Sequence, residues 1–172
     1  MELIVKIKKK LHQFTLDADI ETSSSIALLG ASGSGKSMTL KCIAGIEKPD
    51  RGVIILNGRT LFDSEKKINL PPQKRNVGYL FQNYALFPNM TVRQNIEISM
   101  KKKGGDIESL IAGFYLKGLE NKYPCEISGG QQQRTALARI IASEPYAILL
   151  DEPFSAIDSY MRWKLEMTVS DI

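Results

Sequence analysis

Cysteine, histidine and tryptophan are scarce in this sequence of 172 residues, which holds two cysteines, one histidine and one tryptophan. The cysteines, Cys42 and Cys125, are far apart and make neither a metal-binding nor a disulfide pattern. Cys42 falls within a predicted helix, where we expect it to be a small residue of the core. Cysteine-based metal sites and a disulfide framework are therefore not expected.

Long hydrophobic runs are also missing. No apolar stretch approaches the roughly 20 residues that span a bilayer, and the N-terminus carries no apolar signal segment. We therefore expect the chain itself to be cytosolic and to reach a membrane only by docking on another protein.

Positive charge is in small excess, and the formal net charge is +4. The densest basic clusters, residues 8–10 and 101–103, flank predicted turns, and we interpret them as solvated lysines rather than a nucleic-acid surface. No nucleic-acid partner is predicted. The length and the hydrophobic content of 43% fit one globular domain with its own core.

Periodicity along the chain predicts an α/β fold with an N-terminal antiparallel β subdomain. Apolar residues alternate over 3–7 and again over 14–20, close enough together for a hairpin. Further strands are expected at 26–29, 53–56, 77–81 and 147–150. Helices are expected at 37–44, 95–100, 107–116 and 131–143. The region of about 91–130, where strand signals vanish, predicts a small helical insert.

A P-loop pattern, G-x-x-x-x-G-K-[ST], lies within the stretch LLGASGSGKSMTL at residues 28–40. Glycines let the backbone curl so that N–H groups converge on phosphate oxygens, and the helix that follows points its positive end at the same anion. Lys36 would reach the outer phosphates, and the Ser37 hydroxyl would hold Mg²⁺. The predicted nucleotide-binding residues are Gly30, Ala31, Ser32, Gly33, Ser34, Gly35, Lys36, Ser37 and Met38. The alternative is a glycine-rich turn that binds nothing, which the predicted strand before it and helix after it disfavour.

Two carboxylates, Asp151 and Glu152, end the apolar run at 147–150. Ligands of open α/β sheets bind at the carboxyl ends of strands, where the P-loop and these acids would both fall. Asp151 is suited to holding Mg²⁺, directly or through water, and Glu152 to polarising an attacking water. The alternative is that the two acids only end the strand and cap the next element.

A second anion-binding nest is predicted at Ser128, Gly129, Gly130 and Gln131, where a serine and two glycines open a helix. One chain has no need of two sites for a terminal phosphate. The second nest is explained if it closes over a nucleotide held by another copy of the chain.

These motifs together resemble the ATP-binding-cassette (ABC) ATPases. ISGGQ at 127–131 is similar to the family's signature motif, LLDEP at 149–153 to its Walker B segment and catalytic glutamate, and SAID at 155–158 to its D-loop. Gln82 matches the Q-loop glutamine. Ile127 and Ile157 stand where leucine is usual. The order and spacing of the motifs agree from residue 1 to about 160.

The resemblance implies ATP and Mg²⁺ as ligands and a head-to-tail homodimer. Each ATP would lie between the P-loop, Gln82, Asp151 and Glu152 of one copy and the nest at Ser128–Gly130 of the other. Glu152 and Gln82 would be the catalytic residues, and Ser37, Gln82 and Asp151 would contact the metal. Closure on ATP and opening after hydrolysis would supply a mechanical stroke.

The stretch at 81–92, FQNYALFPNMTV, looks like that of bacterial importer ATPases, which dock there on a helix of an integral membrane permease. An exposed cluster at Tyr84, Leu86 and Phe87 would suit that groove, and core filling is the alternative. The N-terminal hairpin and LPPQKR at 70–75 resemble molybdate- or sulfate-type importers. The expected location is therefore the cytoplasmic face of the cell membrane, as a peripheral subunit.

Two features depart from the family pattern. Importer cassettes usually stack adenine on an aromatic residue near the first strands, but alternation puts Phe14 with the core face, and His12 is no better supported. Family members also continue beyond the D-loop into a strand that carries a switch histidine, whereas here a helix is expected at 159–169 and the sequence stops at Ile172. We therefore expect a C-terminally incomplete ABC ATPase domain over residues 1–172.

Three functions are compatible with these patterns. The first is the ATP-hydrolysing subunit of an importer for an oxyanion such as molybdate or sulfate. The second is a truncated nucleotide-binding fragment without hydrolysis. The third is a soluble, non-transport ABC ATPase, which the Tyr84–Phe87 cluster disfavours.

Overall fold

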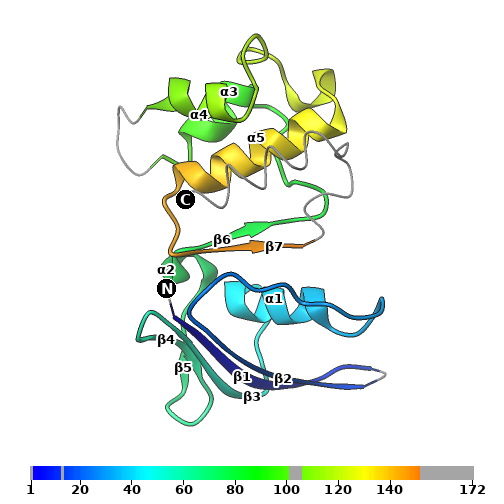
Figure 1. Ribbon diagram of the computed structural model, residues 1–172, viewed down its shortest axis with the longest axis vertical. Coiled ribbons are helices and arrows are strands. Elements are labelled where there is room, and N and C mark those ends of the chain that lie inside the picture. The colour runs from blue at the N-terminus through cyan, green and yellow to red at the C-terminus, as the bar shows by residue number, and fades with distance from the viewer. Residues whose placement is uncertain (1, 13, 101–105, 152–172) are drawn as a thin grey trace. The chain divides into compact units, whose positions relative to one another are not determined.

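The computed structural model describes residues 2–12, 14–100 and 106–151 (Figure 1). Glu152, the D-loop at 155–158 and the helix expected at 159–169 lie outside the described residues. The chain divides into two compact units, Met1–Val77 and Gly78–Ile172, and we describe each by itself. In the described part, none of the helices has the length and apolarity to cross a membrane.

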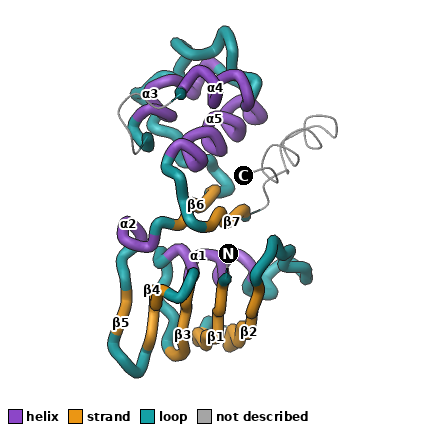
Figure 2. Tube along the Cα trace, turned by 60° about the vertical axis from the view of Figure 1, so that its left-hand side comes forward, coloured by secondary structure: helices purple, strands orange, loops and turns teal. Residues whose placement is uncertain are grey.

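An antiparallel sheet forms the first unit, and its five strands are hydrogen-bonded in the order β2-β1-β3-β4-β5 (Figure 2). The strands are β1 (Leu3–Lys10), β2 (Thr15–Thr22), β3 (Arg51–Leu56), β4 (Arg59–Asp63) and β5 (Ile68–Asn69). The predicted N-terminal hairpin is confirmed, with Val5 opposite Ile20 in the register. Asn57 and Gly58 connect β3 to β4, and both residues take the positive φ that this tight turn requires.

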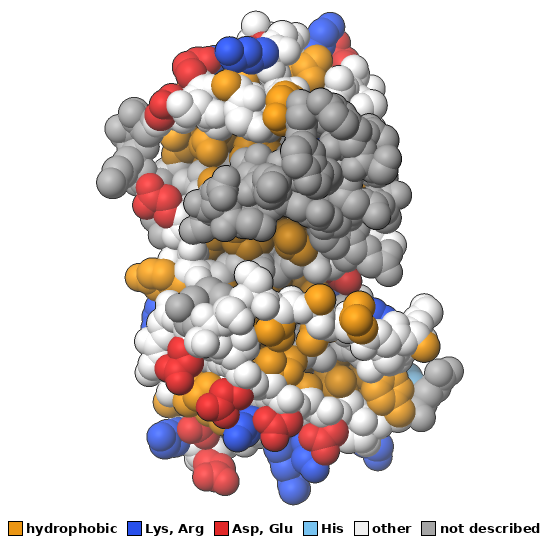
Figure 3. All heavy atoms as spheres, viewed as in Figure 1, with side chains coloured by type: hydrophobic (Ala, Val, Ile, Leu, Met, Phe, Trp, Pro, Cys, Tyr) orange, Lys and Arg blue, Asp and Glu red, His pale blue; other side chains and the backbone are white. Residues whose placement is uncertain are grey.

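Alternation along β1 gives the sheet one buried and one wet face. Val5 and Ile7 are buried beside helix α1 (Lys36–Ala44), which covers that face, whereas Lys8 on the other face pairs with Asp17 at 2.8 Å. Lys9 pairs with Glu47 at 3.3 Å. On the side of this unit that Figure 3 shows, acidic and basic side chains are interspersed.

Helix α1 ends at Gly45, which has φ +82° and leaves room for a buried arginine. Arg75, the last residue of the short helix α2 (Pro72–Arg75), is fully buried. Its guanidinium donates to the Cys42 carbonyl at 2.8 Å, the Ile43 carbonyl at 2.9 Å and the Leu70 carbonyl at 2.8 Å. A fourth bond reaches Asn69 Oδ1 at 2.9 Å. The positive charge therefore satisfies carbonyls at the negative end of α1.

A parallel pair of strands, β6 (Val77–Leu80) and β7 (Ala147–Leu150), belongs to the second unit, and their arrows run the same way in Figure 1. As parallel strands require, a long crossover joins them. The crossover contains α3 (Val92–Glu97), α4 (Ile107–Gly113), the 3-10 helix η1 (Pro124–Glu126) and α5 (Gly129–Ala142). A Cβ on Gly78 would lie 2.4 Å from Ile140 Cγ2, so a glycine lets α5 pack directly on β6.

Helix α3 begins earlier than expected, at Val92 rather than Asn95. Thr91 caps it by accepting from the Gln94 N–H, and the Gln94 side chain accepts from the Thr91 N–H at 2.9 Å. The sequence pattern of this capping box is T-x-x-Q. The box starts the helix at Val92, before the residues whose apolar periodicity had indicated a helix.

The prediction of a strand at residues 26–29 is wrong. These residues form no strand, Leu29 is 92% exposed and Ile26 is 49% exposed. An apolar run becomes a buried strand only where neighbouring strands satisfy its backbone groups, and among the described strands none pairs with it.

We predict that Arg75→Ala lowers the free energy of unfolding by at least about 3 kcal/mol, because several buried carbonyls lose their donor at once. Urea denaturation of the chain measures this loss. Arg51→Ala, an exposed arginine of the same unit, serves as the control and should cost under about 0.5 kcal/mol. Equal effects of the two substitutions would contradict the stabilising role of Arg75.

Candidate functional site

The predicted P-loop residues form a turn that leads directly into α1. Gly33 and Gly35 have φ of +80° and +97°, and Gly35 is the N-cap. No side chain caps the helix, and its first turn holds no acidic residue. The N-terminal N–H groups and the positive end of the helix dipole therefore suit an anion.

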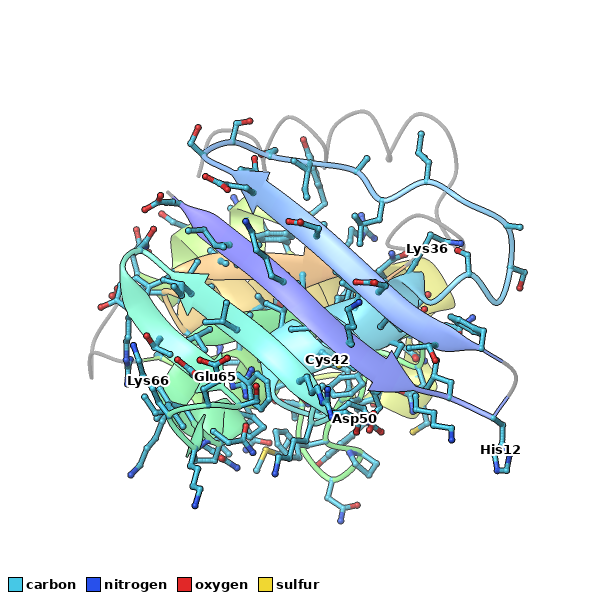
Figure 4. The ribbon with its side chains drawn as sticks, turned by 90° about the horizontal axis from the view of Figure 1, so that it is seen from below. His12, Lys36, Cys42, Asp50, Glu65 and Lys66 are labelled. Atoms are coloured by element: carbon cyan, nitrogen blue, oxygen red, sulfur yellow. The ribbon has the colours of Figure 1, made fainter. Side chains whose placement is uncertain are left out.

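Lys36 folds back over this turn. Its ammonium donates to the carbonyls of Gly30 at 2.7 Å and Ala31 at 2.9 Å, so the side chain lies across the loop rather than in solvent. In Figure 4 it projects from the loop end of α1, whereas His12 lies at the tip of the β1–β2 hairpin. A phosphate bound to the loop would compete with these two carbonyls for the ammonium, which has only three N–H donors.

Phe14 was expected with the core face, and the structure corrects this expectation. Phe14 is 39% exposed, because β2 begins only at Thr15 and its alternation does not extend back to residue 14. Its ring lies beside the P-loop, since a Cβ on Gly35 would lie 3.4 Å from Phe14 Cζ and 2.8 Å from Leu16 Cδ1. An aromatic surface is therefore present next to the predicted phosphate-binding turn.

The predicted second nest opens α5 in the second unit. Ser128 is the N-cap and accepts from the Gln131 N–H at 3.3 Å, while Gln131 Oε1 accepts from the Ser128 N–H at 2.8 Å. This capping box fixes the first turn of the helix. A Cβ on Gly129 would meet no atom within 4 Å, so space lies over the first turn.

Asp151 follows β7, at the carboxyl end of the parallel pair, and Gln82 follows β6 at the same end. The Tyr79 hydroxyl donates to Asp151 Oδ2 at 3.1 Å. Burial, and then the neighbouring charge of Asp151, raise the pKa of Tyr79 well above its usual value, so this hydroxyl keeps its proton at neutral pH. Gln82 itself is exposed.

The residues present fit Mg²⁺ that arrives with phosphate, rather than a metal held by protein alone. Within residues 2–12, 14–100 and 106–151, no three His, Cys, Asp or Glu side chains are grouped to hold an ion. Mg²⁺ commonly takes one or two protein oxygens and completes its shell with phosphate oxygens and water. The Ser37 hydroxyl in the first unit and the Asp151 carboxylate in the second are each an oxygen ligand of that kind.

Two polar residues that the sequence analysis missed, the half-buried Arg139 and the buried Asn95, hold the loop at residues 81–91, which we call the post-β6 loop. Arg139 of α5 donates to the carbonyls of Tyr84 at 3.0 Å and Ala85 at 2.8 Å, both in residues with positive φ. Asn95 of α3 is fully buried; it accepts from the Phe87 N–H at 2.8 Å and donates to the Met90 carbonyl at 3.0 Å.

The cluster predicted to be exposed in this loop is only partly exposed. Tyr84 and Leu86 are half-buried against the helical core, whereas Phe87 is 45% exposed and lies under the Arg139 guanidinium, 5.4 Å from the ring centre. A depression of about 480 Å³ adjoins the loop and is lined by Asn89, Met90, Gln94, Glu97 and Ile98. The loop thus presents one exposed aromatic side chain, and its residues Asn89 and Met90 line a hollow.

We predict that Gly35→Ala costs more stability than Gly33→Ala. Both place alanine in the left-handed region, at about 1 kcal/mol, but only residue 35 also meets packed atoms, which adds about 1–3 kcal/mol. Thermal or urea unfolding of the two variants measures the difference. Equal losses would contradict the close approach of Leu16 to the loop.

We also predict that Arg139→Lys speeds hydrogen exchange at residues 84–87 by about tenfold, since lysine keeps the charge but cannot make the forked bond. Exchange followed by mass spectrometry measures it. Arg93→Lys is the control, because Arg93 pairs with Glu108 at 2.6 Å away from this loop. An unchanged rate in Arg139→Lys would show that Arg139 does not hold the loop.

The sequence pattern of the family described as ABC transporter matches residues 14–155. The sulfate/thiosulfate import ATP-binding protein CysA of Synechocystis sp. is 41% identical over 174 residues, covering 95% of this chain and 47% of the relative. The protein of that name from Thermosynechococcus vestitus is 46% identical over 157 residues, covering 87% of this chain and 45% of the relative. The chain thus spans about half the length of these curated relatives.

A solved structure, the ATP-binding cassette MJ0796 bound to ADP and Pi in a dimeric post-hydrolysis state, aligns with a TM-score of 0.77. It is 26% identical and covers 98% of this chain and 81% of that one. Taken with the family match over residues 14–155, this shows that the chain belongs to the ABC transporter family and has the α/β fold of its ATP-binding cassettes.

Proposed function

We propose that the chain is part of the ATP-binding subunit of an ABC importer and hydrolyses ATP to drive uptake of a small oxyanion. The observation that carries the proposal is the start of α1. Its uncapped N-terminus, glycines with positive φ and a lysine folded over the loop form one phosphate-binding turn. The N–H groups of residues 30–38 would cradle the phosphates, and Lys36 would exchange its two carbonyl partners for outer phosphate oxygens.

The remaining roles follow from chemistry and position. Ser37, Gln82 and Asp151 would hold Mg²⁺, which when bound bridges the phosphates and neutralises their charge. Glu152 would orient the attacking water and accept its proton. Phe14, exposed beside Gly35, offers the base a flat surface for stacking.

A head-to-tail homodimer would complete each site. The nest at Ser128, Gly129, Gly130 and Gln131 caps its own helix, has space above its first turn, and carries no acidic residue there. It would therefore meet the terminal phosphate held by the other copy. The dimeric state named for the MJ0796 cassette supports this arrangement.

The partner proposed for the post-β6 loop is an integral membrane permease, which would place the chain at the cytoplasmic face of the membrane. Phe87 is exposed in this loop, and the depression that adjoins the loop has both apolar lining (Met90, Ile98) and polar lining, which an amphipathic helix from a permease would fit. The relatives' names support sulfate or thiosulfate as the oxyanion. Molybdate, expected alongside sulfate from the sequence, finds no support in those names.

A second candidate function, nucleotide binding without hydrolysis, rests on the segment before the P-loop. Residues 26–29 form no strand and Leu29 is almost fully exposed, so no sheet holds the loop from that side in the described structure. Such a loop would bind phosphate through its own glycines and α1, but would hold it less firmly against a catalytic carboxylate.

The test is to measure binding and turnover in the same purified samples. MgATP at about 100 times its dissociation constant should raise the melting temperature by about 5–10 °C, and phosphate should be released. Lys36→Ala should lose both the thermal shift and the turnover, whereas Glu152→Gln should keep the shift and lose the turnover. Lys41→Ala, a lysine of the same helix, is the matched control and should keep both.

Each outcome decides between the candidates. Absence of any thermal shift in the unmodified chain would contradict nucleotide binding altogether. A shift without turnover would favour the second candidate. Undiminished turnover in Glu152→Gln would overturn the assignment of the base.

A further inference from the structure

Tyr79 belongs to a face of the β6–β7 pair that the helical core does not use. Along β6, Gly78 and Leu80 face α5, since Gly78 abuts Ile140 and Leu80 joins the core cluster around that helix. Side chains alternate along a strand, so Tyr79 and Phe81 project from the opposite face. There the Tyr79 hydroxyl meets the carboxylate of Asp151, which follows the neighbouring strand.

The position of that hydroxyl is fixed by its surroundings. The Tyr79 ring packs edge-on against Phe81, with ring centres 4.8 Å apart and planes at 63°. The ring is itself partly buried on a strand, so little side-chain freedom remains to be lost when it bonds to Asp151. A donor held in this way fixes the rotation of the carboxylate that accepts its proton.

We propose that Tyr79 is a positioning residue for Asp151 and that it sets the affinity of the ATP site for Mg²⁺. This inference rests on the proposed function, in which Asp151 is the carboxylate for the metal. An ionised carboxylate has about four acceptor positions, and the 3.1 Å bond from Tyr79 uses one of them on Oδ2. The carboxylate is therefore held from the side of Oδ2 by a donor on the neighbouring strand.

Orientation matters here because Mg²⁺ tolerates little departure from octahedral geometry. A carboxylate that rotates freely spends part of its time turned away from the ion. Hydrogen-bond partners behind a metal ligand remove that freedom, and their loss typically costs about 10–100-fold in metal affinity. Phosphate oxygens would share in holding this ion, so the effect of losing Tyr79 should lie near the lower end of that range.

The test compares Tyr79→Phe with the unmodified 172-residue chain in binding a fluorescent N-methylanthraniloyl-ATP. Phenylalanine keeps the ring and its contact with Phe81 and removes only the hydroxyl. Mg²⁺ is titrated at fixed nucleotide, and nucleotide is titrated separately in EDTA. We expect Tyr79→Phe to require about tenfold more Mg²⁺ for half-maximal binding and to bind nucleotide in EDTA as the unmodified chain does. Mn²⁺ binding, followed by electron paramagnetic resonance with ATP present, should weaken by a similar factor.

Tyr146→Phe is the matched control, because it removes a hydroxyl from a tyrosine of the same unit that is 57% exposed. It should leave the Mg²⁺ dependence unchanged. An unchanged Mg²⁺ requirement in Tyr79→Phe, or an equal loss of binding in EDTA, would overturn the positioning role while leaving nucleotide binding intact. If the unmodified chain binds no nucleotide with or without Mg²⁺, the proposed function fails and this inference fails with it.

Discussion

The two ends of helix α1 impose the constraint on which the first unit depends. At the C-terminal end, the buried guanidinium of Arg75 caps the helix by donating hydrogen bonds to the carbonyls of Cys42 and Ile43. At the N-terminal end, neither a side-chain cap nor an acidic residue is present. The helix is therefore supplied with positive charge where its own dipole is negative, and its positive end is left for an anion.

The same helix shows why the glycines of the P-loop are not interchangeable. Gly35 is packed against Leu16 and Phe14, so both its positive φ and its missing side chain are needed. Gly33 has open space around it, and only its φ matters.

Burial also affects the thiol of Cys42 in α1. It raises the pKa of Cys42 to about 11, which keeps that thiol protonated and unreactive at neutral pH.

The sequence correctly predicted the helices, strands and turns whose formation depends on residues close together in the chain. The hairpin, α1, the helix opened by Ser128 and two glycines, and the strand before Asp151 all follow from alternation and glycine signals, and all are present. The strand at 26–29 failed because its stability depends on neighbours distant in sequence, which periodicity does not report. The prediction for Phe14 failed because β2 begins at Thr15, so residue 14 precedes the strand and does not follow its alternation.

The side-chain bonds that hold the loops and the site were not predicted from the sequence. Arg75, Arg139, Asn95 and the bond from Tyr79 to Asp151 join positions whose spacing carries no motif. A single weak signal existed for Asn95, an amide placed among apolar residues at helical spacing. For the site residues themselves, the motifs named positions and chemistry, but not the carbonyls that hold Lys36 or the hydroxyl that holds Asp151.

The post-β6 loop contains strained backbone that is held by a side chain of α5. Tyr84 and Ala85 both have positive φ without being glycine, which costs about 1–2 kcal/mol for each residue. The forked bonds from Arg139 to their carbonyls work against that cost, since a hydrogen bond from a charged donor is stronger than one between neutral groups. Arg139 also belongs to α5, whose first turn contains the nest at Ser128. One helix therefore carries both the side chain that holds the loop and the turn predicted to meet the terminal phosphate.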